Sequence, residues 1–146
     1  MHKPSRVKRL STLTASLLLG TVSSFSFAAE IAVIVNKANN ASLDKSAIEK
    51  IFTGRMKSFP DGNVAIPMNA AKSMSSRDDF NQNVLGRSSS QVNAYWSKLV
   101  FTGKGNMPME LGSDTEIIST ISANTGAIGY VNVSSVTDDV KVIAKF

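Results

Sequence analysis

The hydrophobic positions that follow residue 30 fall into continuous apolar runs and stripes with helical spacing. Residues 31–35 form an unbroken run of β-branched type, typical of a strand covered on both faces, so we expect it inside a sheet. Apolar residues then recur at helical spacing over 43–52, and this stripe ends at Gly54. Ser42 stands where a helix cap is expected, and Asp44 falls in the first turn, where the helix dipole favours negative charge.

The next segments predict a second strand and a second helix. The stretch 59–63 is typical of a turn, and the apolar residues at positions 64, 66 and 68 alternate as in a strand. Two serines then precede two aspartates at capping-box spacing: Ser75, Ser76, Asp78 and Asp79. A helix that these residues cap and that ends at Gly86 is therefore expected.

The third predicted helix has the largest apolar face in the chain. Ser88 and Gln91 have capping-box spacing and open it. Its apolar face consists of Val92, Tyr95, Trp96, Leu99 and Val100.

A fourth helix and two strands complete the predicted fold. Ser113 with Glu116 begins the helix, which closes at Gly126, and strands are expected over 127–133 and 140–146. Strands thus alternate with helices, which predicts an α/β fold with a sheet flanked by helices. Ligands of such sheets bind at loop ends where helices begin.

Residues 1–28 have the pattern of a secretory signal peptide. Four basic residues precede an uncharged stretch over 10–27, and the small residues Ser26 and Ala28 fit cleavage after Ala28. A retained membrane anchor is the alternative, but the serines and threonines of this stretch make it too polar for a comfortable crossing. We therefore expect a single domain over 29–146, located in the periplasm without stable membrane insertion after cleavage.

Removal of the signal peptide changes the electrostatic picture. The full chain has a formal charge of +5, whereas residues 29–146 hold 12 basic and 11 acidic residues, a charge of +1. Because they contain no Lys/Arg run interleaved with aromatics, nucleic acid is not an expected partner. The chain has no cysteine, and its one histidine, His2, leaves with the signal peptide. Disulfides, thiol nucleophiles and Cys-ligated metals are excluded, and we expect no metal or other cofactor.

No catalytic constellation stands out in residues 29–146. Ser42 and Lys45 have the Ser-x-x-Lys spacing of serine acylases, but the accompanying Ser-Asp-Asn and Lys-Thr-Gly elements are absent. The carboxylate pairs at 78–79 and 138–139 are adjacent in sequence, so their side chains diverge and cannot straddle one bond. We therefore expect a protein that is not an enzyme.

Four segments occur here in an order that resembles a known family: residues 43–54, 59–62, 94–105 and 126–131. They read LDKSAIEKIFTG, FPDG, AYWSKLVFTGKG and GAIGYV, and they resemble the substrate-binding proteins of phosphate ABC importers. The resemblance covers residues 31–133 and is closest to a short, exported, single-lobe branch that matches the second lobe of two-lobed relatives. It implies one lobe of a type II periplasmic-binding-protein-like fold, with a mixed sheet flanked by helices.

The same resemblance implies where a ligand binds. Relatives of this kind hold phosphate with an RSDGSGT-like loop between a strand and a helix, and residues 68–77 correspond to that loop. Ala70 takes the place of the arginine and Met74 that of the serine, whereas Ser76 keeps the hydroxyl of the threonine. The candidate ligand-binding residues are Asn69, Lys72, Ser73, Ser75, Ser76 and Arg77. The alternative is that Ser75 or Ser76 only caps the helix and that Arg77 is a solvated first-turn residue.

Two functions follow from this interpretation. The first is an exported protein that binds phosphate or a similar oxyanion at a helix N-terminus and is related to ABC transport. A single lobe offers half of the contacts of a two-lobed receptor, so a homodimer or an envelope protein partner is expected to supply the second wall. The alternative function is an interaction module of a cell-envelope assembly that retains the fold without binding a ligand.

Overall fold

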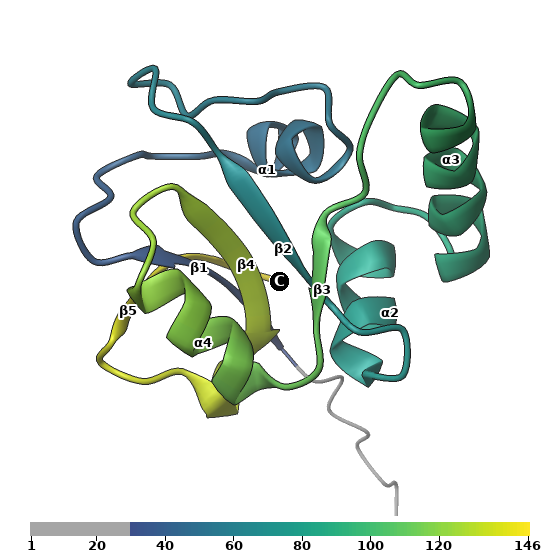
Figure 1. The fold of residues 1–146 in the computed structure, drawn as a ribbon. Helices are drawn as coiled ribbons and strands as arrows, with labels where there is room; N and C mark the ends of the chain where they lie inside the picture. Colours follow the sequence, from purple (N-terminus) through teal and green to yellow (C-terminus); the bar gives the residue numbers. More distant parts are fainter. Residues whose placement is uncertain (1–29) are drawn as a thin grey trace, which may run out of the picture.

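The structure, a computed structural model, describes residues 30–146. The signal peptide predicted over 1–28 lies outside the described residues, and the domain boundary at residue 29 stays a prediction. The described part of the chain forms a mixed five-stranded sheet with helices on both faces (Figure 1). The predicted α/β fold class is therefore confirmed.

The sheet has the strand order β3-β2-β4-β1-β5. Its members are β1 (Ile31–Asn36), β2 (Ile66–Ala70), β3 (Met109–Leu111), β4 (Ala127–Asn132) and β5 (Val140–Lys145). β2 runs parallel to β3 and β4, whereas β1 is antiparallel to both of its neighbours, β4 and β5. The strands β2, β3 and β4 therefore end at one side of the sheet, which we call the carboxyl edge, and β1 begins there.

β1 lies inside the sheet, as its unbroken apolar run predicted. All of its residues are buried, and it pairs with β4 on one side and β5 on the other. The register with β5 shifts between Val33 and Ile34. β-Branched side chains pack well on both faces of a strand, so burial on both sides explains this composition.

Helices cover the two faces of the sheet. They are α1 (Lys45–Phe52), α2 (Ser75–Asn83), α3 (Ser89–Phe101) and α4 (Asp114–Ser122), and the short 3-10 helix η1 (Val133–Ser135) follows β4. Gly129 of β4 faces α4, because a Cβ at this position would lie 2.7 Å from Cδ1 of Ile121. Tyr130 points to the opposite face, where its ring stacks on Phe80 of α2 with centroids 3.9 Å apart. The ring of Phe52, from α1, packs against both, so α1 and α2 share this face.

Two of the predicted helix starts are confirmed in detail. Ser88 accepts a hydrogen bond from the backbone N–H of Gln91 at 3.2 Å, and the Gln91 side chain accepts one from the Ser88 N–H at 2.9 Å. This is the complete capping box that the spacing predicted. Ser113 caps α4 by accepting from the N–H of Glu116 at 3.1 Å.

The other two helix starts differ from the prediction. Asp44, not Ser42, caps α1, and its carboxylate accepts from the N–H of Ala47 at 2.7 Å. α2 has Met74 at its cap position and no side-chain cap, so the prediction that Ser75 or Ser76 caps it is wrong. Both serines are already helical residues, which places their side chains beyond the position from which a cap reaches the first N–H groups.

Two element boundaries and one additional strand also differ from the prediction. The second strand begins at Ile66 because Val64 belongs to the preceding turn, where it bridges Ser58 and is 64% exposed. β3 was not predicted, since it is only three residues long and its first two residues are exposed. α4 ends at Ser122, before the turn that leads to Gly126.

Candidate functional site

The predicted loop lies at the carboxyl edge of the sheet, between the end of β2 and the start of α2 (Figure 1). The N–H of Ala71 donates to Leu111 O at 2.9 Å, and the N–H of Met74 donates to Ala71 O at 3.0 Å. The first bond holds the turn against the end of β3, and the second closes the turn. The first N–H groups of α2 therefore point to the edge at which ligands of α/β sheets bind.

Ser76 is the second residue of α2 and is almost fully buried. The residue is 1% exposed, and its hydroxyl has no hydrogen-bond partner among the described residues. Buried polar groups are nearly always paired, so an unpartnered hydroxyl at a helix N-terminus is unusual. It offers one donor and acceptor to a group that approaches this end of the helix.

Arg77 is buried as deeply as Ser76, and its side chain turns back toward the sheet. Nη1 donates to Ala70 O at 2.8 Å and lies 3.0 Å from Oε1 of Glu110, on β3. Nη2 has no partner among the described residues. The guanidinium thus reaches Ala70, the position at which the family's loop has its arginine. The alternative of a solvated first-turn arginine is wrong, because Arg77 is 1% exposed.

Asn69 is tied into the core by Tyr130. The Tyr130 hydroxyl donates to Oδ1 of Asn69 at 2.6 Å and accepts from the N–H of Ala70 at 3.2 Å. Burial raises the pKa of the Tyr130 hydroxyl well above its ordinary value, and the Ala70 N–H and the charge of Arg77 lower it by less. Tyr130 is therefore a neutral hydrogen-bond donor that fixes the end of β2.

The six predicted ligand-binding residues fall into two groups. Asn69, Ser76 and Arg77 are buried, whereas Lys72, Ser73 and Ser75 are exposed on the turn and the start of α2. Ser75 also lines a cavity of about 550 Å³ at the carboxyl edge, together with Glu30, Asn132, Val133 and Ser134. A solute that arrives from solvent therefore contacts Lys72, Ser73 and Ser75 before the three buried residues.

Two residues of this region were not predicted. Glu110 pairs with Arg77, but it belongs to the strand that the sequence did not indicate. Tyr130 occurs in the segment GAIGYV, which indicated a strand and gave no reason to place its hydroxyl beside Asn69. Both contacts join residues far apart in the sequence, so local patterns do not reveal them.

The described residues contain neither a metal-binding cluster nor a membrane-spanning helix. Within residues 30–146, no group of three or more His, Cys, Asp or Glu side chains is arranged to hold a metal ion. No helix in the same part of the chain combines the length and apolar character needed to cross a bilayer.

Comparison with known proteins bears on the fold. No family model and no curated protein matches the chain. An ABC-type phosphate transport receptor from Vibrio cholerae matches with a TM-score of 0.61 and 19% identity, over 79% of this chain and 46% of that one. PstS from Borrelia burgdorferi matches with a TM-score of 0.58 and 14% identity, over 80% of this chain and 47% of that one.

A third structure is described as a phosphate ABC transporter substrate-binding protein from Clostridium perfringens, solved with bound phosphate. It matches with a TM-score of 0.62 and 22% identity, over 79% of this chain and 45% of the other. The chain thus has a mixed-sheet fold that occurs within larger receptors, and it spans less than half the length of these structures. That fold is the one of phosphate ABC transporter substrate-binding proteins, so the predicted resemblance is confirmed for the fold.

Proposed function

We propose that this chain is an exported, periplasmic protein that binds phosphate or a similar oxyanion at the N-terminus of α2, without catalysis. The observation that carries the proposal is the pair of unpartnered groups there, the Ser76 hydroxyl and Nη2 of Arg77, on two residues that are nine-tenths or more buried. A hydroxyl, a guanidinium and the first N–H groups of a helix are together a donor set for an oxyanion. The solved structures of the same fold are transport receptors, and one holds phosphate.

The exposed group supplies the entrance to this site. Lys72 adds a cation and Ser73 and Ser75 add hydroxyls on the turn, where a solute arrives first. Because Ser76 and Arg77 are almost fully buried, neighbouring groups have to move for the ligand to reach them. The helix dipole contributes about 0.3–1 kcal/mol to the binding free energy of an anion, and hydrogen bonds from the charged guanidinium contribute more.

Glu110 opposes anion binding in the structure described here. Its carboxylate compensates the charge of Arg77 at 3.0 Å. An oxyanion that enters this site takes over that role, so the Glu110 side chain, a third of which is exposed, has to turn toward solvent. This competition lowers the affinity of the site for an oxyanion, because the anion has to displace Glu110 from Arg77.

If receptors of this fold enclose their ligand between two lobes, a chain with one lobe supplies only about half of the contacts with the ligand. A receptor that binds at about 1 μM has a binding free energy near −8.2 kcal/mol, and half of the contacts leave about −4.1 kcal/mol, a millimolar affinity. A second copy of this chain or an envelope protein is therefore proposed as the second wall. Sedimentation with and without phosphate tests the homodimer, which a strict monomer in both conditions contradicts.

Calorimetry of the chain purified after export tests the binding proposal. We expect heat of binding with millimolar phosphate, and its loss in Ser76→Ala and in Arg77→Gln. Ser119→Ala is a matched control, because Ser119 is an exposed helical serine on α4, away from the site. The absence of heat in the unmodified chain at millimolar phosphate contradicts the proposal, as does an equal loss in the control.

The second candidate function is an interaction module without a ligand. The C-terminal end of α3 favours it, because Phe101 is 92% exposed and Val100 is half exposed. Exposed apolar side chains that gather on one part of a protein mark surfaces for other macromolecules. A chain that gives no heat with phosphate but binds a protein through this surface has the second function.

A further inference from the structure

A groove of about 390 Å³ lies at the other end of β2, between the C-terminal turn of α1 and the loop that leads from α3 to β3. Figure 1 shows where these elements lie. Its lining includes Met56 and Lys57 from the α1 side, Trp96 and Leu99 from α3, and Lys104 and Pro108 from the loop. It shares no residue with the site at α2. The proposed oxyanion site therefore does not account for this groove.

Trp96 lies at the base of the groove, where it is only 2% exposed, and the backbone approaches its ring from two sides. A Cβ at Gly54 would lie 3.0 Å from Cη2 of Trp96, and a Cβ at Gly105 would lie 3.4 Å from its Cζ3. Gly54 also has a φ of +73°, a conformation that favours glycine. Both glycines thus let the backbone pack closely on the buried indole, which fixes the base of the groove.

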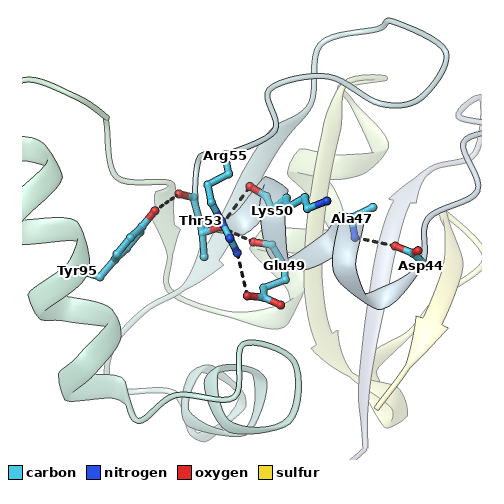
Figure 2. A network of polar contacts seen from close by, with 7 residues as sticks. All are labelled: Asp44, Ala47, Glu49, Lys50, Thr53, Arg55 and Tyr95. Carbon is cyan, nitrogen blue, oxygen red and sulfur yellow. Dashed lines mark hydrogen bonds and ion pairs between the residues drawn. The ribbon is translucent and has the colours of Figure 1, made fainter.

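The wall of the groove on the α1 side is held in place by hydrogen bonds. The Tyr95 hydroxyl of α3 donates to Thr53 O at 2.7 Å, which joins α3 to the end of α1 (Figure 2). Nε of Arg55 donates to Oγ1 of Thr53 at 3.0 Å, and its Nη2 lies 2.9 Å from Oε1 of Glu49. A wall fixed in this way loses little conformational entropy when a partner binds.

The lining combines apolar side chains with two free cations. Ile51, Met56, Pro67, Leu99 and Pro108 are apolar, and no carboxylate belongs to the lining. Lys57 and Lys104 are exposed, and neither takes part in the two ion pairs found within residues 30–146. The partner that complements this surface has an apolar side chain flanked by carboxylates.

We propose that this groove docks an acidic peptide segment of a partner protein. An apolar side chain of the segment packs on the half-buried Met56, Pro67 and Leu99, above the buried Trp96. Carboxylates on either side of it pair with Lys57 and Lys104. Val100 and Phe101, which follow Leu99 at the end of α3, do not line the groove and are exposed. The proposal does not depend on oxyanion binding, since the two sites have no residue in common.

A second copy of this chain does not offer such a segment among its described residues. Its adjacent acidic pairs are followed by Phe80 and Val140, and both of these apolar side chains are buried. An exposed apolar side chain between carboxylates is therefore not found beside either pair. The chemistry favours a different protein as the occupant.

Trp96 allows a direct test, because it is the single tryptophan of the chain and lines the groove. The probe is a capped hexapeptide with a central phenylalanine between aspartates, added at low ionic strength. We expect a saturable change in tryptophan fluorescence, and none with the peptide that has lysines for aspartates or glycine for phenylalanine. The double variant Lys57→Glu/Lys104→Glu is expected to weaken binding at least about tenfold, because two attractions become repulsions.

The control is Lys37→Glu/Lys145→Glu, which changes the net charge equally at two exposed lysines that do not line the groove. It is expected to bind the aspartate peptide within about twofold of the unmodified chain. The proposal is overturned if the unmodified chain gives no saturation or if both double variants lose binding equally. It is also overturned if sedimentation shows self-association that only the groove variant abolishes. Phosphate calorimetry on the groove variant separates the two sites, and unchanged heat is expected there.

Discussion

Arg77 and Glu110 form an ion pair that joins the start of α2 to β3, with 3.0 Å between Nη1 and Oε1. The guanidinium end is almost fully buried, whereas a third of the Glu110 side chain remains exposed. Arg77 also donates to the backbone of Ala70, so one side chain links the first turn of α2 to two strands. The carboxylate is the more exposed member of this pair, and it neutralises the charge that an oxyanion needs.

Replacement of Glu110 by glutamine tests whether this carboxylate competes with an oxyanion for Arg77. Glutamine keeps a hydrogen-bond acceptor for Arg77 but removes the negative charge, so phosphate affinity is expected to rise several-fold, corresponding to about 1 kcal/mol for a partly exposed pair. The free energy of unfolding is expected to fall by up to about 1 kcal/mol, because the guanidinium loses its counter-charge. Calorimetry and urea denaturation measure the two effects.

Glu49→Gln is the matched control for this substitution. Glu49 forms the other ion pair, with Arg55 at 2.9 Å, and its side chain is equally exposed. The control is expected to leave phosphate affinity unchanged. If Glu110→Gln weakens phosphate binding, the carboxylate is not a competitor of the anion and this account of the site is wrong.

Ser76→Ala is expected to separate stability from binding. The Ser76 hydroxyl is buried without a partner, so its removal is expected to raise the free energy of unfolding by about 1 kcal/mol. The same change is expected to abolish the heat of phosphate binding. Thermal or urea denaturation checks the first effect, and a clear loss of stability would show that the hydroxyl has a structural partner after all.

The elements that could be predicted have strong local signals. The unbroken apolar run of β1 and the capping box of Ser88 and Gln91 are complete within a few residues, and the structure confirms both. The start of α1 could not be fixed from local signals in the same way. The helix begins two residues later than the position that Ser42 suggested, and only the structure decides which of the two residues is its cap.

The sequence predicted which loop carries the candidate residues, but it did not predict the contacts that these residues make. The loop that carries most of the candidate residues lies between a strand and a helix, as the resemblance implied, although a ligand there stays a proposal. The contacts that bury Arg77 connect it with Ala70 and Glu110, and those that bury Asn69 connect it with Tyr130. These contacts depend on which strands are neighbours in the sheet, and a single sequence does not contain that information in a local pattern.

The two alternative caps of α1 provide a paired prediction. Asp44→Ala is expected to lower the free energy of unfolding by about 1 kcal/mol, because the N–H of Ala47 loses its acceptor. Ser42→Ala, two residues earlier on an exposed position, is expected to change it by less than about 0.5 kcal/mol. Urea denaturation of both variants checks the pair, and equal losses would contradict the assignment of the cap.

Tyr130→Phe is expected to weaken the fold and to change its dependence on pH. The hydroxyl bonds both Asn69 and the N–H of Ala70 inside the core, so its removal is expected to cost about 1–3 kcal/mol of unfolding free energy. Burial raises the pKa of Tyr130 in the folded chain above the value of about 10 that it has when unfolded. The folded state therefore holds its proton more tightly, and the unfolded state gains stability as soon as it ionises.

The stability that depends on the neutral hydroxyl is thus complete below about pH 10 and declines as the pH rises above that value. The unmodified chain is expected to lose unfolding free energy between about pH 10 and pH 11, and Tyr130→Phe is expected to lose less over the same interval. Tyr95→Phe is the control, because its hydroxyl bonds Thr53 O at the half-buried junction of α1 and α3. Urea denaturation at several pH values measures the slopes, and identical slopes for the unmodified chain and Tyr130→Phe would show that the Tyr130 hydroxyl is not the group that links folding to alkaline pH.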